Sequence, residues 1–307
     1  MTAGAELVQK VSDAENTTEE SAYGHWAASL DLQIRKRNAC SKLSRCRHKG
    51  PLYVKKPFYP EGDDLAHIYL LHPPGGLVSG DDLRIDIDVQ EGAGALVTTP
   101  GATRIYRSRH DRALQQQHIS LSVKDNASLE WFPFESIVYN DADVLLSTTV
   151  DLAAEGIFVG WEVTCFGLPA SDQLFTQGAF RQHYVVKRCG RPVFVDRLDI
   201  DAGTPHGQHF LQGRAGMQGL TVSGFFMVSW GGDLPLSVID WVSQLREEMQ
   251  LLGVDQYVAI TYVGHYLIAR YLGNSAEQAR YCFTHLWNLV RPIVLQRAAN
   301  IPRIWLT

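Results

Sequence analysis

The chain has little cysteine and no long apolar run, and both shortages limit what it can be. It contains 5 cysteines among 307 residues, an odd number without the spacing of a disulfide framework. This usage is typical of a reduced protein, so we predict a cytoplasmic location. No uninterrupted apolar run could span a bilayer, and the N-terminus lacks the apolar core of a signal peptide. We therefore expect no membrane partner.

The chain also lacks a strong excess of charge and the common motifs of nucleotide enzymes and hydrolases. Its net charge is −5, which provides no overall field for binding nucleic acid. The glycine-rich segments lack the Gly-Lys-Ser/Thr of a P-loop, and Gly92-Ala93-Gly94 lacks the third glycine of a dinucleotide fingerprint. No Gly-x-Ser-x-Gly elbow occurs. These absences argue against nucleic-acid binding, nucleotide-dependent catalysis and serine hydrolysis.

What the chain does contain is alternation of apolar and polar residues from Trp26 to about Leu220. Residues 83–89 alternate strictly, and residues 118–123 repeat the pattern, as expected of half-buried strands. Turn residues separate these short runs. The pattern predicts a mainly β (α+β) fold of many short, mostly antiparallel strands in stacked sheets.

Two helices are predicted near the C-terminus. Apolar residues step by four and three from Val238 to Leu252, and Ser275 with Gln278 fits a capping box for a second helix. Pro292 should kink or end this second helix. Residues 1–22 are polar and without period, which predicts a disordered extension. Residues 23–307 contain no evident linker, so we predict one β-rich domain that includes both helices.

Residues 71–81 form a loop with an unusual density of backbone-restricting residues. Two prolines and three glycines precede two carboxylates, Asp81 and Asp82. Prolines fix φ, whereas glycines permit backbone angles closed to other residues. The loop is either a rigid strand connection or a device that places Asp81 at the mouth of the next strand.

Glu162 is the only charge in an apolar segment, residues 157–168, that should be buried on both faces. An isolated buried carboxylate must be paired, protonated, hydrated or bound to a cation. Asp196 is likewise a single carboxylate that directly follows an apolar run, residues 193–195, and it too needs a partner, a proton, water or a cation. A buried ion pair with a distant arginine and a binding role both remain open for each residue.

The sequence gives less support to other possible sets of metal ligands. Cys40, Cys46 and His48 lie among many lysines and arginines, which oppose a dication, and their spacing fits no standard zinc site. A solvated basic hairpin explains them better. The pairs His67/His72 and His206/His209 are better explained as loop or surface histidines.

Several motifs, taken in order, resemble the UreD family of urease accessory proteins, called UreH in some organisms. The resemblance covers the chain from about Trp26 to its last residue. The matching segments are Gly50-Pro51-Leu52-Tyr53-Val54, Lys56-Pro57-Phe58-Tyr59-Pro60-Glu61, the loop 71–81, Thr99-Pro100-Gly101-Ala102-Thr103, Tyr106-Arg107-Ser108, Leu129-Glu130-Trp131-Phe132-Pro133 and Pro302-Arg303-Ile304-Trp305-Leu306-Thr307.

The resemblance implies a maturation scaffold or chaperone that is not an enzyme. It implies that the protein binds UreF, through UreF the GTPase UreG, and also the urease apoprotein. It further implies a path for nickel in transit, with no catalytic residue, no stable metal site and no tightly bound cofactor. The implied path residues are Asp81, Thr103, Glu162 and Asp196, and we expect Asp81 to matter most. This chain differs from the family at Ser79, usually Gly, at Glu162, usually Asp, and at Asp196, usually Glu. Each carboxylate change moves the ligand oxygens by one methylene and keeps the charge.

Two alternatives come from other classes of protein. A metal-dependent hydrolase would use Asp81, Asp82 and Glu162 as ligands or as an acid–base pair. A structural binding module would have no metal route. In the scaffold interpretation we expect apolar residues near the C-terminus to be exposed and to contact UreF. These residues are Phe283, Leu286, Trp287, Val290 and Trp305.

Overall fold

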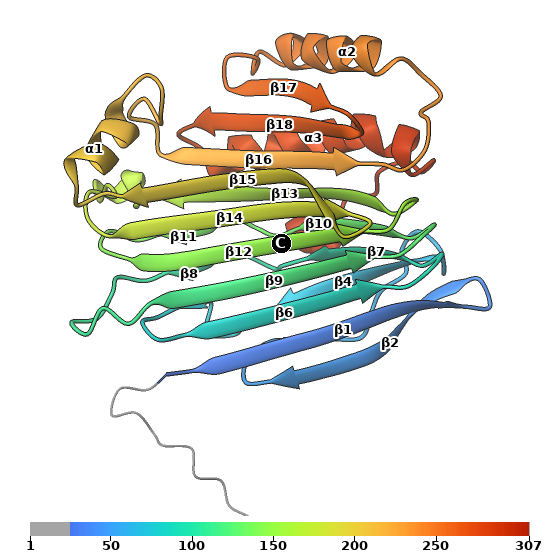
Figure 1. Ribbon diagram of the computed structural model, residues 1–307, viewed down its shortest axis with the longest axis horizontal. Helices are drawn as coiled ribbons and strands as arrows, with labels where there is room; N and C mark the ends of the chain where they lie inside the picture. Colours follow the sequence, from blue (N-terminus) through green and yellow to red (C-terminus); the bar gives the residue numbers. More distant parts are fainter. Residues whose placement is uncertain (1–24, 307) are drawn as a thin grey trace, which may run out of the picture.

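Two β-sheets lie face to face and form the body of the protein (Figure 1). The computed structural model describes residues 25–306, so the predicted disorder of residues 1–22 lies outside the described residues. The mainly β prediction is confirmed. The single-domain prediction for residues 23–307 stays a prediction. Within the described part of the chain, no helix has the length and apolar character needed to cross a membrane.

The first sheet has seven strands in the order β15-β14-β12-β9-β6-β1-β2. The alternation in the sequence identifies its buried face: in β6, Ile85 and Ile87 are buried, whereas Arg84 and Asp86 are exposed. The strands are β1 (Ala27–Arg37), β2 (Cys40–Lys49), β6 (Asp82–Val89), β9 (Gln115–Val123), β12 (Asp143–Leu152), β14 (Ala179–Arg188) and β15 (Arg191–Asp201).

The second sheet has eleven strands, eight of them in the order β17-β18-β16-β13-β10-β7-β4-β3. Three short strands, β5 (Gly76–Leu77), β8 (Thr103–Ile105) and β11 (Ser136–Val138), extend it sideways from β13. The others are β3 (Tyr53–Val54), β4 (Leu65–Leu71), β7 (Gly94–Thr98), β10 (Ser128–Phe132), β13 (Ile157–Phe166), β16 (Val222–Ser229), β17 (Val258–Val263) and β18 (Tyr266–Gly273).

The prediction of mostly antiparallel strands was wrong for the centre of both sheets. Strands β1, β6, β9, β12 and β14 pair in parallel, and so do β4, β7, β10 and β13. Antiparallel pairs lie towards the edges, such as β1–β2 and β14–β15. From β6 to β14 the long strands alternate between the sheets, so a strand of the opposite sheet provides each crossover that parallel pairing needs.

Both predicted C-terminal helices are present, as α2 (Val238–Leu251) and α3 (Ala276–Val294). Ser275 caps α3 by accepting a hydrogen bond from the backbone N–H of Gln278 at 3.0 Å, and the helix ends shortly after Pro292. The prediction missed α1 (Pro205–Gln212), a short helix with little apolar periodicity to reveal it. Short 3₁₀ turns cover Pro169–Ser171 and Arg303–Leu306.

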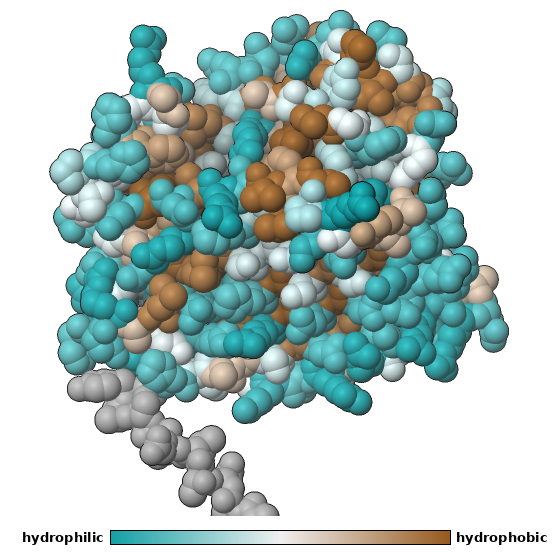
Figure 2. Space-filling view, in the orientation of Figure 1, coloured by the Kyte–Doolittle hydropathy of each residue, from teal (hydrophilic) through white to brown (hydrophobic). Residues whose placement is uncertain are grey.

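The eleven-stranded sheet is buried on both faces. One hydrophobic core fills the space between the two sheets, and a second lies between the eleven-stranded sheet and helices α2 and α3. The outer face of the seven-stranded sheet is mostly hydrophilic over its lower strands, and apolar side chains gather higher in the view (Figure 2). Val195 on β15 and Val263 on β17 belong to the exposed apolar residues.

Candidate functional site

Two cavities adjoin at Glu162 in the middle of β13. The first, called the inner cavity, has a volume of about 250 Å³ and is lined by residues of both sheets, including Thr103 and Thr148. The second, the outer cavity, has a volume of about 450 Å³ and is lined by residues that include Asp196 and Phe225. Glu162 and Gln182 line both cavities. Glu162 therefore lies between the two spaces.

A row of hydroxyl groups forms one wall of the inner cavity. Thr103 on β8 pairs with Ser136 on β11, and Ser136 pairs with Thr164 on β13. All three side chains line the cavity. Residues two apart on a strand share a face, so Thr164 and Glu162 lie on the same side of β13. Adjacent strands lie about 4.8 Å apart, so the row leads across the sheet in short steps towards Glu162.

The seven-stranded sheet forms the opposite wall and supplies the hydrogen-bond partners of Glu162. The hydroxyl of Thr148 on β12 donates to Glu162 Oε1 at 2.7 Å. The amide Nε2 of Gln182 on β14 donates to Glu162 Oε2 at 2.5 Å. Both carboxylate oxygens are thus held by neutral donors. Among residues 25–306 no lysine or arginine forms an ion pair with Glu162, so the ion-pair interpretation was wrong for this residue.

Burial raises the pKa of Glu162 to about 6. The hydrogen bonds from Thr148 and Gln182 favour the charged form and oppose this rise, whereas the nearby charge of Asp196 adds to it. Glu162 is consequently ionised at neutral pH but takes up a proton under mildly acidic conditions. A carboxylate that is desolvated and has no cation partner is well suited to attract a cation.

Asp196 lies on β15 at the outer cavity, where it has a cation partner. Its carboxylate accepts hydrogen bonds from both terminal nitrogens of Arg270 on β18, at 2.8 and 3.1 Å. The ion-pair interpretation is therefore confirmed for Asp196, although the pair is partly exposed rather than buried. The neighbouring Arg197 is not its partner. A cation could bind Asp196 only by competing with Arg270.

Asp81 is buried but lines neither cavity. Its Oδ2 accepts a hydrogen bond from the backbone N–H of Val78 at 2.8 Å, and its backbone N–H donates to the Val78 carbonyl at 3.0 Å. Burial raises the pKa of the Asp81 carboxyl, and the charge of Arg109 opposes the rise. The carboxylate of Asp81 thus closes the turn at the end of the loop, which gives it a structural role. A role for Asp81 in a metal path stays a prediction.

The glycines of the loop 71–81 bring it against the wall of the inner cavity. A Cβ atom on Gly76 would lie 2.1 Å from the carbonyl oxygen of Arg104 in β8, so only glycine fits there. Gly75 has φ +72° and donates its N–H to the His72 carbonyl at 2.8 Å. His72 and Gly75 both line the inner cavity. The loop is a rigid connection, and it also forms part of the cavity.

The carboxylates proposed for a hydrolase are not brought together. The carboxylate of Asp82 pairs with Arg84 on the outer face of the sheet, at 2.9 Å. Asp81 closes its own turn, and Glu162 lies between the sheets. Within residues 25–306 no group of three His, Cys, Asp or Glu side chains could hold a metal ion, and this includes Cys40, Cys46 and His48.

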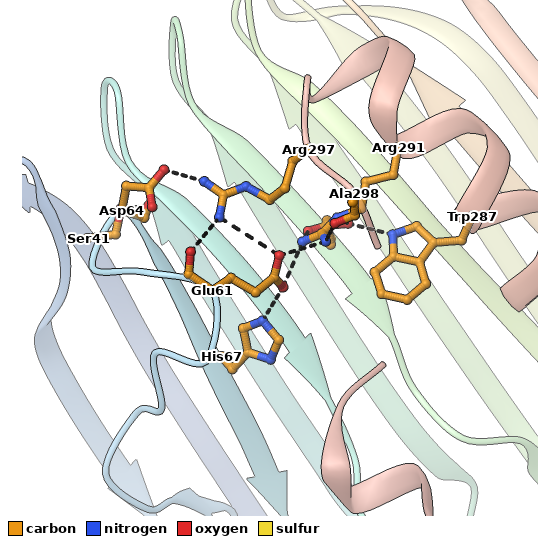
Figure 3. Close-up of polar contacts among 9 residues, drawn as sticks. Ser41, Glu61, Asp64, His67, Trp287, Arg291, Arg297 and Ala298 are labelled. Carbon is orange, nitrogen blue, oxygen red and sulfur yellow. Dashed lines mark hydrogen bonds and ion pairs between the residues drawn. The ribbon is translucent and has the colours of Figure 1, made fainter. Parts of the chain in front are cut away.

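The sequence interpretation missed a buried charge network, drawn in Figure 3. Arg291 of α3 is fully buried and donates to both oxygens of Glu130 on β10, each at 2.9 Å. It also donates to both oxygens of Glu61, at 2.7 and 2.9 Å. Trp287 donates to Glu130 at 2.6 Å, and the imidazole of His67 lies 2.7 Å from Glu61. A single charge within each of two apolar stretches was the signal that could have revealed Glu130 and Arg291.

The expected exposure of the C-terminal apolar residues was wrong. The side chains of Phe283, Leu286, Trp287 and Val290 are fully buried in the second core, against the eleven-stranded sheet. Trp305 is partly buried and donates its indole N–H to the Thr98 hydroxyl at 2.8 Å. The apolar stripe of α3 thus packs inside the chain. A partner surface at this end stays a prediction, and it would have to use other side chains.

Fold and site together define a β-rich scaffold with an internal cavity lined by hydroxyl groups and one desolvated carboxylate. Comparison with known proteins specifies the class further. A family model described as "UreD urease accessory protein" matches residues 27–306. The chain belongs to this family of urease accessory proteins.

Individual relatives agree with the family match. The "Urease accessory protein UreD" of Marinomonas sp. (strain MWYL1) is 40% identical over 293 residues, which cover 94% of this chain and 92% of the relative. The protein of the same name from Pseudoalteromonas translucida is 37% identical over 312 residues and is covered in full, as is this chain. A third, from Chromohalobacter salexigens, is 40% identical over 92% of this chain and 90% of its own length.

Proposed function

We propose that this chain is a urease maturation scaffold that passes nickel through its two cavities to the urease apoprotein. Membership of the UreD family supports the accessory role. The observation that supports the nickel path is that Glu162, a desolvated carboxylate without a cation partner, lines both cavities. A cation that moves from one cavity to the other would pass this side chain.

The chemistry of the lining favours transit over storage. Nickel binds tightly to sites rich in nitrogen and sulfur, and hydroxyl, carboxylate and amide oxygens hold it more weakly. A conduit must bind its ion strongly enough to accept it and weakly enough to release it. Thr103, Ser136 and Thr164 offer neutral oxygens, and Glu162 offers one negative charge. Nickel is therefore cargo in this proposal.

Each predicted path residue has a distinct place in the proposal. Thr103 and Glu162 act along the inner cavity, and Asp196 acts at the outer cavity once nickel displaces Arg270. Asp81 acts through the loop that it closes, at one end of the inner cavity wall. In this scheme the chain itself catalyses no reaction.

The partners of the scaffold follow from the resemblance to the family. The chain would bind UreF, reach the GTPase UreG through UreF, and present its nickel to the urease apoprotein in the cytoplasm. The relatives carry only the name of a urease accessory protein, so each partner is part of the proposal.

Replacement of Glu162 by glutamine tests the path, because it keeps the shape of the side chain and removes its charge. Urease matured with the Glu162→Gln scaffold should contain several-fold less nickel than urease matured with the wild type, while the scaffold still co-purifies with its partners. Glu91→Gln, the same change in an exposed turn, is the matched control and should leave nickel loading unchanged. Full loading with Glu162→Gln would refute the path through this residue.

A further inference from the structure

The inner cavity contains one imidazole, that of His72. This residue directly follows β4 and lines the cavity together with Glu162, Thr103 and Thr148. Its side chain is half-buried. Its backbone is fixed by the turn to Gly75 and by the two prolines that follow it.

The imidazole of His72 is a polar group without a protein partner. Its carbonyl accepts the N–H of Gly75, but its ring forms no hydrogen bond within residues 25–306. His67, only a few residues earlier on β4, is instead engaged with Glu61 at 2.7 Å. The ring is only half-buried, so water in the cavity can hydrate it, and a metal ion that enters the cavity can replace that water.

The protonation state of His72 leaves a nitrogen lone pair free. Burial lowers the pKa of His72 below its ordinary value near 6.5, so the ring is neutral at pH 7. A neutral imidazole is a strong ligand for first-row divalent ions, and it binds nickel better than a hydroxyl or an amide oxygen does. The other polar side chains of the inner cavity offer hydroxyl, carboxylate or amide atoms, and the indole of Trp131 offers only a donor.

We propose that His72 is a nickel ligand of the inner cavity, at a step of the path separate from Glu162. This inference rests on the proposed function and adds a nitrogen ligand to it. β4, which directly precedes His72, and β13, which carries Glu162, are three strands apart in the sheet, about 14 Å, so one ion does not contact both residues. A single imidazole makes a weak, open site, in keeping with the absence of any three-residue ligand group among the described residues. Water and the hydroxyls of the wall would complete the coordination.

The first test observes binding directly and does not depend on urease. The full chain contains 11 histidines, whose imidazole signals are followed by NMR in ¹⁵N-histidine-labelled protein during titration with paramagnetic Co²⁺ and then Ni²⁺. The His72 signal, assigned by its loss in His72→Gln, should broaden at lower metal concentration than that of His206, which is exposed on α1. A His72 signal that persists while exposed histidines broaden would overturn the proposal.

The second test separates ligation from packing. His72→Phe keeps an aromatic ring but removes the lone pair, and His72→Gln removes both the ring and the nitrogen ligand. Both variants should lower the nickel content of matured urease several-fold, whereas the control His206→Gln should not. Thermal denaturation checks that each variant is folded. Normal loading with His72→Phe would assign the ring a packing role and overturn the proposal.

The two proposals fail in distinguishable ways. If Glu162→Gln lowers nickel loading and both His72 variants do not, the path remains and His72 is not part of it. If substitution of neither residue affects nickel loading, the proposed path through the inner cavity is refuted, and so is the role of His72 as a ligand on that path.

Discussion

Glu162 shows how one side chain can be costly to the fold and useful to function. Its carboxylate is desolvated between the sheets and held by two neutral donors, Thr148 and Gln182. No buried counter-charge compensates it among residues 25–306. Such an arrangement favours the neutral acid in the folded chain, so ionisation of Glu162 lowers the free energy of unfolding.

This opposition predicts a pH-dependent gain of stability in Glu162→Gln. The pKa of the folded carboxyl is about 6, above the 4.5 of a solvated glutamate, so the folded chain holds the extra proton between these values. The free energy of unfolding therefore falls as pH rises through this window, by about 2 kcal/mol for this group. Glu162→Gln should be more stable than wild type by up to that amount at pH 8, and equal to it near pH 4.

Urea denaturation at both pH values measures the effect. The Glu91→Gln control should show no such difference. A loss of about 3–5 kcal/mol in Glu162→Gln at pH 8 would mean that a buried cation pairs with this carboxylate after all.

The sequence predicted that Glu162 needs a partner, but it could not identify the partner. An isolated charge in residues 157–168 is visible in one strand. Thr148 and Gln182 belong to β12 and β14 of the opposite sheet, and nothing in their own segments distinguishes them from other polar residues of alternating strands. Asp196 looked equivalent to Glu162 in sequence, yet the register of β15 places it beside Arg270. Whether each carboxylate has a cation partner therefore depends on which side chains lie next to it in space, and these come from distant strands.

At the scale of elements, the buried network of Arg291 joins helix α3 to the sheet. Its guanidinium contacts Glu130 of β10 and Glu61 of the loop before β4, and it donates to the carbonyl of Ala298 at 2.5 Å. Burial raises the pKa of Glu130, and its contacts with Arg291 oppose that rise. Arg291 is thus the cation that pairs with both buried carboxylates, and Arg297 lies 3.8 Å from Glu61 as a second cation.

Arg291→Met should therefore be strongly destabilising. The variant leaves Glu130 without its cation, and it leaves Glu61 with only the more distant Arg297 and the imidazole of His67. The expected loss is about 3–5 kcal/mol in the free energy of unfolding, measured with urea at pH 7. Arg84→Met removes the exposed partner of Asp82 and serves as the matched control, with an expected change below about 1 kcal/mol. Equal effects of the two substitutions would show that the network contributes no more than a surface pair.

Strands were more predictable than their arrangement. Period-two alternation located β6 and β9 and their buried faces, because burial of one face imposes the pattern on the strand itself. Parallel or antiparallel pairing leaves no comparable pattern within a strand. Hairpin-like turn residues suggested antiparallel neighbours, but several of those turns lead the chain to the opposite sheet, as between β6 and β7.

At the scale of the whole molecule, the C-terminal segment packs against residues from much earlier parts of the chain. Arg297 pairs with Asp64, and the indole of Trp305 bonds to Thr98 and packs in an aromatic cluster with Phe132 and Trp161. Thr98 lies directly before the segment Thr99–Thr103, which lines the inner cavity. The C-terminal segment therefore supports the wall of the cavity from outside, and its removal would damage the fold as well as any interface.

A partner surface at this end must use the side chains that remain exposed. Ile301 is 42% and Leu306 77% exposed, and both line a groove of about 400 Å³ between the C-terminal segment and α3. Exposed apolar groups along such a groove are typical of a protein interface. We predict that Ile301→Ser with Leu306→Ser weakens co-purification with UreF several-fold while thermal stability stays near that of wild type.

Trp305→Ala should instead lower stability by about 3–5 kcal/mol, because it empties a packed site. Unchanged complex yield with the double serine variant would exclude the groove as the UreF surface, and a stability loss equal to that of Trp305→Ala would show that the two residues serve the fold.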